Sequence, residues 1–229
     1  MYFSVKIRWM TVKYLGVVLV LAMLYASACT SDNKDVKIQT GDLLFQQWDS
    51  SDFAKAINAV TEGADGVDYA HIGLVLSLDD TLKVLEAVTG DGVVLRPLDA
   101  FLKASLTADS LPRVAIGRLK KDYSSFIPKI NEWALSKVGM PYDTLFIYGN
   151  DKYYCSELIY DAFNENVAGE AVFSLAPMTF KDPETNNFFP VWETYYKKQK
   201  EEIPEGEPGI NPGLISRSAK IEIVEVLWE

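Results

Sequence analysis

Cysteine and histidine are scarce in this sequence of 229 residues, which contains two cysteines and a single histidine. Two cysteines cannot form a disulfide framework, and one histidine leaves no His/Cys cluster for a structural zinc. We therefore expect neither a metal nor a cofactor. Basic residues are also few, with 22 Lys plus Arg against 32 Asp plus Glu and a net charge of -10. Because nucleic-acid binding depends on clustered Lys and Arg, this balance argues against nucleic acid as a partner.

Apolar and aromatic residues are abundant by contrast. Hydrophobic residues make up 48% of the chain and aromatic residues 12%. A chain of this kind can bury a core, which excludes wholesale disorder. Its length suits one domain with room for a long insertion.

The N-terminal stretch has the features of a secretory signal. Its only charged residues, Lys6, Arg8 and Lys13, precede an apolar run over residues 15–25. That run is too short to span a hydrocarbon core of about 30 Å as a helix. It is typical of the apolar region of a signal peptide.

The apolar run ends in Ala-Ser-Ala-Cys at residues 26–29, which resembles the lipobox of bacterial lipoproteins. In that motif the cysteine is lipidated and becomes the mature N-terminus. We predict a signal peptide over residues 1–28, a tether over 29–40 with lipid on Cys29, and one domain over 41–229. The alternative is a short membrane anchor with an unmodified cysteine.

This prediction places the protein in the cell envelope, attached to the membrane through the lipid on Cys29. An acidic chain is not attracted to anionic lipid, so the acyl chains must provide the anchoring. Thr30 rather than an aspartate follows the cysteine, which favours the outer over the inner membrane in a Gram-negative organism. No pattern in the sequence indicates an oligomeric state.

Hydrophobic periodicity predicts an α+β domain with strands in the middle and helices at both ends. The expected strands cover residues 41–46, 69–78, 82–88, 93–97, 113–119 and 221–228. The expected helices cover residues 51–59, 100–106, 126–138 and 154–164, with Asp99 as the cap of the second. The stretch 186–212 is aromatic and then rich in Pro, Gly and Glu, and it is expected to be a long surface loop.

Cys155 is the one free thiol if Cys29 is lipidated. It lies in the first turn of the helix predicted over 154–164 and shares an apolar stripe with Leu158 and Ile159. A thiol there is close to unpaired backbone N–H groups and to the positive end of the helix dipole, which favour a thiolate and can hold an oxyanion. The alternative is a small buried hydrophobic residue.

His71 lies in an apolar strand, with Gly73 two residues further on and therefore on the same face. The absence of a side chain at Gly73 is expected to leave room for an opposing helix, and so for Cys155. A strand histidine can equally be a structural residue, and a strand glycine can mark a bulge.

Glu86 interrupts the apolar strand that follows the Asp79-Asp80 turn. An inward carboxylate is costly unless a charged or hydrogen-bonded group meets it. Because its strand pairs with that of His71, we expect Glu86 to accept the second ring N–H and to orient the imidazole. The alternative is an edge-strand glutamate that points to water.

Four short motifs together resemble a known family. They are HIG at 71–73, LEAV at 85–88, GMPYD at 139–143 and YYCSEL at 153–158. This set is similar to the permuted NlpC/P60, papain-like amidases of the YiiX/YaeF type. The resemblance begins at GDLLF, residues 41–45, and covers most of the mature chain.

The resemblance implies a circularly permuted papain-like fold, an antiparallel central sheet or half-barrel packed on helices, with the His strand before the Cys helix. It implies that Cys155 is the nucleophile, His71 the general base and Glu86 the orienting residue. It further places Tyr142 and Tyr154 at the substrate or the oxyanion. A loop over 144–153 stands where ordinary NlpC/P60 enzymes have a GGxxFDCSG segment.

These residues predict a cysteine amidase or peptidase that acts through a thioester, with acyl transfer as a variant. The expected substrates are peptidoglycan stem peptides or amides of N-acyl amino acids and lipids. The alternative is a non-catalytic envelope lipoprotein that binds cell-wall peptides, and paired carboxylates for glycoside hydrolysis are a third possibility. Several aromatic residues can line a groove or pack in the core: Trp48, Phe188, Phe189, Trp192, Tyr195 and Tyr196.

Overall fold

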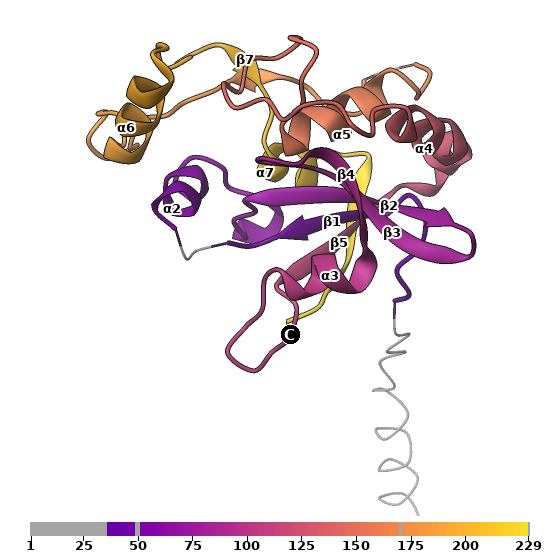
Figure 1. Cartoon of the computed structure of the whole chain (residues 1–229). Coiled ribbons are helices and arrows are strands. Elements are labelled where there is room, and N and C mark those ends of the chain that lie inside the picture. Colours follow the sequence, from indigo (N-terminus) through magenta and orange to yellow (C-terminus); the bar gives the residue numbers. More distant parts are fainter. Residues whose placement is uncertain (1–35, 49–50, 170, 229) are drawn as a thin grey trace, which may run out of the picture. The chain divides into compact units, whose positions relative to one another are not determined.

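A six-stranded antiparallel sheet organises the chain in the computed structural model, which describes residues 36–48, 51–169 and 171–228. The strands lie in the order β4-β3-β2-β1-β5-β8 (Figure 1). Their bounds are β1 Leu43–Gln46, β2 His71–Leu78, β3 Thr81–Val88, β4 Gly92–Pro97, β5 Val114–Leu119 and β8 Ile221–Val226. A separate short pairing joins β6 Ala176–Pro177 to β7 Pro208–Gly209.

Helices cover both faces of the sheet, with α4 and α5 on one face and α3 on the other (Figure 1). Their bounds are α2 Asp52–Asn58, α3 Leu98–Lys103, α4 Ile127–Leu135, α5 Cys155–Asn164, α6 Pro190–Gln199 and α7 Pro212–Ser216. Two short 3-10 helices are η1 Ala64–Gly66 and η2 Lys121–Phe126. Among the described residues, no helix is both long and apolar enough to cross a membrane.

Strand β2 is buried on both faces, which explains its nearly continuous apolar sequence. Ile72 and Leu74 face the core beneath α5, where they join Leu158 and other residues of that helix. Val75 points the opposite way and packs with Phe101 of α3. Successive strand side chains alternate between faces, so His71 shares the face of Val75.

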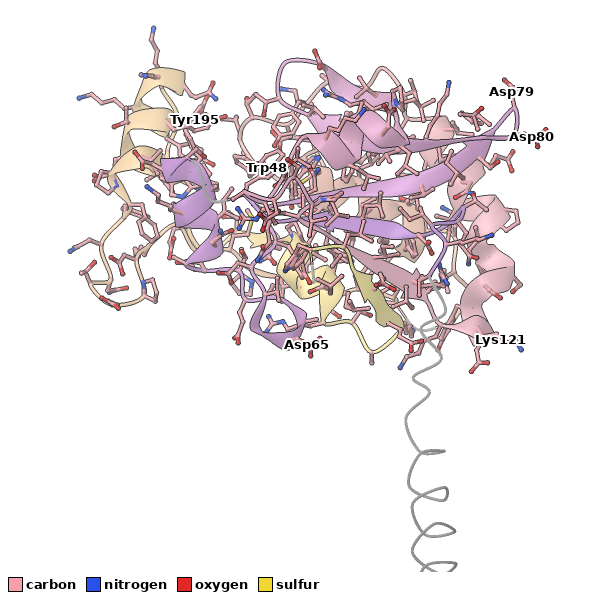
Figure 2. The ribbon with its side chains drawn as sticks, turned by 90° about the horizontal axis from the view of Figure 1, so that it is seen from below. Trp48, Asp65, Asp79, Asp80, Lys121 and Tyr195 are labelled. Atoms are coloured by element: carbon pink, nitrogen blue, oxygen red, sulfur yellow. The ribbon has the colours of Figure 1, made fainter. Side chains whose placement is uncertain are left out.

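The turn between β2 and β3 is the two-residue hairpin that the sequence predicts. Asp79 and Asp80 have positive φ values of 49° and 57°, as a type I′ turn requires. Figure 2 shows both side chains at the tip of the hairpin, far from Trp48. The turn fixes the register that pairs Leu74 with Leu85.

The prediction of a long loop over 186–212 is wrong, because this stretch contains α6 and β7 and ends at the first residue of α7. Pro190 occupies the first turn of α6, where a missing N–H has no cost. Trp192 and Tyr196, one helical turn apart, are buried in an aromatic cluster with Phe180 and with Ala56 of α2. Aromatic packing between α2 and α6 therefore stabilises a helix in a segment that is polar elsewhere.

Two helix boundaries differ from the sequence prediction. Pro97 is the N-cap of α3, so Asp99 lies within the first turn and accepts a hydrogen bond from Lys103 at 3.1 Å. Helix α4 ends at Leu135, and Val138 lies beyond it with 45% exposure.

The folded unit spans residues 37–229 and includes residues 37–40, which the sequence analysis places in the tether. The Lys37 carbonyl accepts a hydrogen bond from Arg118 at 3.0 Å, and Asn131 donates to the Thr40 hydroxyl at 2.9 Å. The predicted signal peptide and Cys29 lie outside the described residues.

Candidate active site

Helix α5 places Cys155 at its first position, directly after Tyr154, whose backbone is extended. The helix is held against the sheet by its buried stripe, which includes Leu158 and Ile159. Cys155 is itself 9% exposed. Because Tyr154 makes no side-chain capping bond, the first N–H groups of the helix, which begins at Cys155, have no cap from that side chain. They are suited to bind an oxygen that acquires negative charge.

His71 begins β2 and is held between two aromatic rings. The indole of Trp48 stacks on the imidazole with 4.9 Å between centroids and 12° between planes. The ring of Phe101 lies on it at 5.9 Å and 31°. Gln46 of β1, opposite His71 in the sheet, donates from its side chain to the Phe101 carbonyl at 2.7 Å. The imidazole is thus fixed in one plane.

Glu86 of β3 is buried and lies between two basic side chains. Its Oε2 is 2.5 Å from Nε2 of His71, and its Oε1 is 2.9 Å from Nε of Arg96 in β4. Arg96 also donates to Asp91 at 3.0 Å. Glu86 therefore does not point to water, and both of its oxygens have a partner.

His71 also forms a hydrogen bond with Cys155. Burial of the ring lowers the pKa of His71, but the hydrogen bonds to Cys155 and Glu86 raise it and prevail, to about 9. The imidazole is therefore protonated at neutral pH. Since Nε2 faces Glu86, Nδ1 is left for the sulfur. The fold brings the three predicted residues together, and their catalytic roles stay predictions.

Gly73 does not make room for Cys155, so that prediction is wrong. A Cβ at this position would collide with Val84 and would crowd Phe101, which lie on the α3 face and not beside Cys155. Gly73 makes room for Phe101, and Phe101 in turn contacts the imidazole. The glycine therefore affects the site through the packing behind His71.

Both predicted tyrosines line the same cavity as Cys155. Burial raises the pKa of Tyr142, and the nearby Cys155 adds to this effect. Burial also raises the pKa of Tyr154, with Glu157 adding to it. The Tyr154 hydroxyl accepts a hydrogen bond from the Ile210 N–H at 3.2 Å, so it holds the segment that follows β7. Tyr142 is the better placed of the two for an oxyanion.

The cavity beside Cys155 has a volume of about 580 Å³ and is mostly apolar. His71, Cys155 and Tyr142 lie among its polar lining residues, which also include Ser51, Thr61, Thr89, Ser156, Thr179, Asn211 and Arg217. Apolar side chains make up much of the rest. These include Phe53, Ile57, Val60, Ala87, Phe146, Met178, Phe180, Ile210 and Leu214. Of the aromatic residues considered for a groove, Trp48, Trp192 and Tyr195 line the cavity, whereas Tyr196 belongs to the core. Figure 2 shows Trp48 on the side of the sheet where α2 lies and where α6 carries Tyr195.

Arg96 is a site residue that the sequence analysis does not identify. It lies opposite Val84 in the register of β3 and β4, while Glu86 lies opposite Val94. Arg96 and Glu86 are thus diagonal neighbours on one face, within reach of a long side chain. The predicted strands over 82–88 and 93–97 contained this signal, because a basic residue two positions from the partner of a buried carboxylate is placed to neutralise it.

Comparisons with known proteins bear on the family and the fold. The sequence profile of a family described as "Permuted papain-like amidase enzyme, YaeF/YiiX, C92 family" matches residues 37–225. The uncharacterized protein YiiX of Escherichia coli strain K12 is 31% identical over 134 residues, which are 58% of this chain and 61% of that protein. The match thus spans less than two thirds of the relative's length.

A solved structure shares the fold. The crystal structure of metalloprotein yiiX from Escherichia coli O157:H7 matches with a TM-score of 0.67 and 24% identity, over 85% of this chain and all of that one. The predicted permuted papain-like α+β fold is thereby confirmed. In the described part of this chain, no group of three or more His, Cys, Asp or Glu side chains could hold a metal ion.

Proposed function

The chain belongs to the permuted papain-like amidases of the YaeF/YiiX family, and on this basis we propose that it is a cysteine-dependent amidase for amides of apolar acyl groups. The family supports an amidase in general. The observation that carries the finer proposal is the position of His71, which is hydrogen-bonded to Cys155 on one side and to Glu86 on the other. This is the arrangement that an activated nucleophile requires.

In the proposed reaction the Cys155 thiolate attacks the amide carbonyl and forms a C–S bond. The N–H groups at the start of α5 bind the oxyanion, with Tyr142 beside it. His71 gives its proton to the amine as the C–N bond breaks, and a thioester is left. Water then attacks the thioester carbonyl and gives a proton to His71. The C–S bond breaks, the carboxylic acid leaves, and the thiolate is restored. Glu86 holds the ring through both steps.

The lining of the cavity favours an apolar acyl group over a stem peptide. Stem peptides are polar, and recognising them requires several buried donors and acceptors. The cavity has a few hydroxyl and amide groups, but most of its lining is apolar and comes from aromatic and aliphatic side chains, including those of α2, α6 and the β6–β7 region. Burying apolar surface there contributes roughly 25 cal/mol per Å². We include in the proposal the lipid anchor on Cys29, which would hold the enzyme next to lipid substrates.

Comparison of the wild type with Cys155→Ala tests the reaction. Both proteins are incubated with a library of acyl amides of increasing chain length and with purified sacculi, and products are identified by mass spectrometry. We expect the wild type to release acyl acids from long-chain amides and Cys155→Ala to release none. Equal product from both proteins would refute a cysteine-dependent enzyme. Release of peptides from sacculi alone would refute the acyl specificity.

Thiol labelling separates an enzyme from a protein that only binds peptides. Iodoacetamide should alkylate Cys155 rapidly, because a sulfur that is hydrogen-bonded to an imidazole and borders the cavity is an activated nucleophile. Peptide mapping distinguishes Cys155 from Cys29, and Glu86→Gln serves as the comparison, since it removes the partner that holds the ring. A wild-type rate no faster than that of a model thiol would favour the binding protein.

A further inference from the structure

The cavity beside Cys155 has one permanently charged side chain in its lining, that of Arg217. Among the described residues that line this cavity there is no Asp, Glu or Lys. The chain as a whole has more acidic than basic residues, 32 against 22. The lining of this cavity has the reverse balance, with one arginine and no carboxylate. A single guanidinium, in addition to the imidazole of His71, thus borders a mostly apolar space.

The segment that carries Arg217 is fixed in place. Arg217 follows α7 directly as its C-cap. Asn211 caps the start of α7 by accepting from the Leu214 N–H at 2.8 Å. At its end, the Ser216 hydroxyl accepts from the Ala64 N–H at 2.9 Å and donates to the Gly213 carbonyl at 2.8 Å. The backbone beneath the guanidinium is therefore anchored to the rest of the domain.

Arg217 differs from the arginines that have a structural task. Arg96 binds Glu86 and Asp91, and Arg118 binds Asp42 through two nitrogens at 2.7 and 2.8 Å. For Arg217, no carboxylate of the described residues lies within the 4.0 Å that defines an ion pair. Its side chain is exposed to solvent at the edge of the cavity. The guanidinium thus has its donors available to a ligand.

We propose that Arg217 binds an anionic group of the substrate, a carboxylate or a phosphate, at the polar end of the acyl amide. The inference rests on the proposed function and adds to it a second recognition element, opposite in character to the apolar lining. A guanidinium forms paired hydrogen bonds with the oxygens of either anion. The substrate class is then an N-acyl amino acid or an N-acyl aminoalkyl phosphate, and not a neutral acyl amide.

Two matched substrate pairs test this proposal. The carboxylate pair is N-dodecanoylglycine and N-dodecanoylglycinamide, and the phosphate pair is N-dodecanoyl phosphoethanolamine and N-dodecanoylethanolamine. We expect the wild type to prefer one or both anionic members by roughly tenfold or more in kcat/KM. Arg217→Gln should lose this preference and retain its activity on the neutral members. The preference should shrink at about 0.5 M salt, because an exposed ion pair is screened.

Lys198→Gln is the matched control, since it removes the same charge from an exposed residue that lines a different cavity. This variant should keep the wild-type preference. An equal loss on all four substrates in Arg217→Gln, or a wild type that treats both members of each pair alike, would overturn the proposal. The pair that shows the preference identifies the anion as carboxylate or phosphate.

Binding to Cys155→Ala separates this inference from the proposed reaction. Calorimetric titration with the same four compounds needs no turnover, so it reports recognition alone. Tighter binding of the anionic members, abolished by adding Arg217→Gln, supports the inference even if the wild type hydrolyses none of them; the reaction alone would then be refuted. Hydrolysis of all four without a charge preference in rate or binding would refute the role of Arg217 and leave the amidase intact.

Discussion

Two buried glutamates near the start of α5 have opposite surroundings. Glu86 is 4% exposed and Glu157 is 1% exposed. Glu86 lies between the imidazole of His71 and the guanidinium of Arg96. Glu157 accepts a hydrogen bond from the Gly149 N–H at 2.9 Å, and its Oε2 has no hydrogen-bond partner among the described residues.

The difference shows that partners, and not depth, decide what a buried carboxyl group does. Burial raises the pKa of Glu157 to about 8, and the nearby Asp143 and Asp161 add to this effect. A neutral carboxyl group there can hold the loop before α5 but cannot stabilise a cation. Glu86 is instead placed to stabilise the protonated His71. The side of α5 that faces β3 carries the chemistry, and the side that faces residues 143–149 serves the fold.

The largest expected effect comes from Glu86→Gln. The amide cannot stabilise the imidazolium and leaves Arg96 without its main partner, so kcat/KM on a long-chain acyl amide should fall by roughly 10²–10⁴. Steady-state kinetics measure the change. Glu157→Gln is the matched control and should retain activity within about threefold of wild type. If both variants lose activity equally, the contrast between the two glutamates has no catalytic meaning.

Stability should depend on pH through His71. Its pKa is about 9 in the folded protein against an ordinary value of 6.5. A raised pKa contributes stability that is fully present below pH 6.5 and is lost as the pH rises through about 9. The loss amounts to about 3 kcal/mol. Urea unfolding from pH 6 to 10 should show this decline, and His71→Asn should reduce it; an unchanged decline would mean that other groups cause it.

Glu157→Gln should increase stability at neutral and alkaline pH. The raised pKa of Glu157, about 8 against an ordinary 4.5, favours the folded wild type below pH 4.5, and this contribution is lost as the pH rises through 8. Glutamine stays neutral throughout, so the variant should gain about 4 kcal/mol over wild type near pH 8 and nothing near pH 4. The same unfolding measurements apply, and a gain that does not change with pH would point to packing instead.

Among the substitutions expected to lower activity, Arg96→Gln should have the smallest effect. Arg96 is a positioning residue, since it contacts Glu86 and not the reacting atoms. With its side chain 38% exposed, water replaces part of its interaction, and kcat should fall by roughly tenfold with KM unchanged. Arg96→Lys should recover part of the loss because a cation returns beside Glu86. A rise in KM without a change in kcat would exclude this role.

The sheet and the reactive residues could be predicted from the sequence, because each left a local signal. Every predicted strand is found, since apolar runs and turn residues set their limits. Cys155, His71 and Glu86 stand out as chemically unusual residues in otherwise apolar elements. The register of the hairpin then places Glu86 on the same face of the sheet as His71, because the Asp79-Asp80 turn connects their two strands.

The parts that could not be predicted depend on contacts between distant segments. Helix α6 is stable because Trp192 and Tyr196 pack on α2 and on Phe180, which no short window of sequence reveals. The packing partner of Gly73 is Phe101, from a helix that follows two strands later. Arg217 follows a single turn of helix, which is too short for hydrophobic periodicity to indicate which way the side chain points.

The indole stacked on His71 also makes the site visible to spectroscopy. Trp48 is 36% exposed and lines the cavity, so a compound that enters beside the sulfur must cover or shift it. Its emission should move toward shorter wavelengths as water leaves, and the difference spectrum between wild type and Trp48→Phe isolates that signal from the other tryptophans. Occupancy can thus be followed in real time without a label and before any bond is broken.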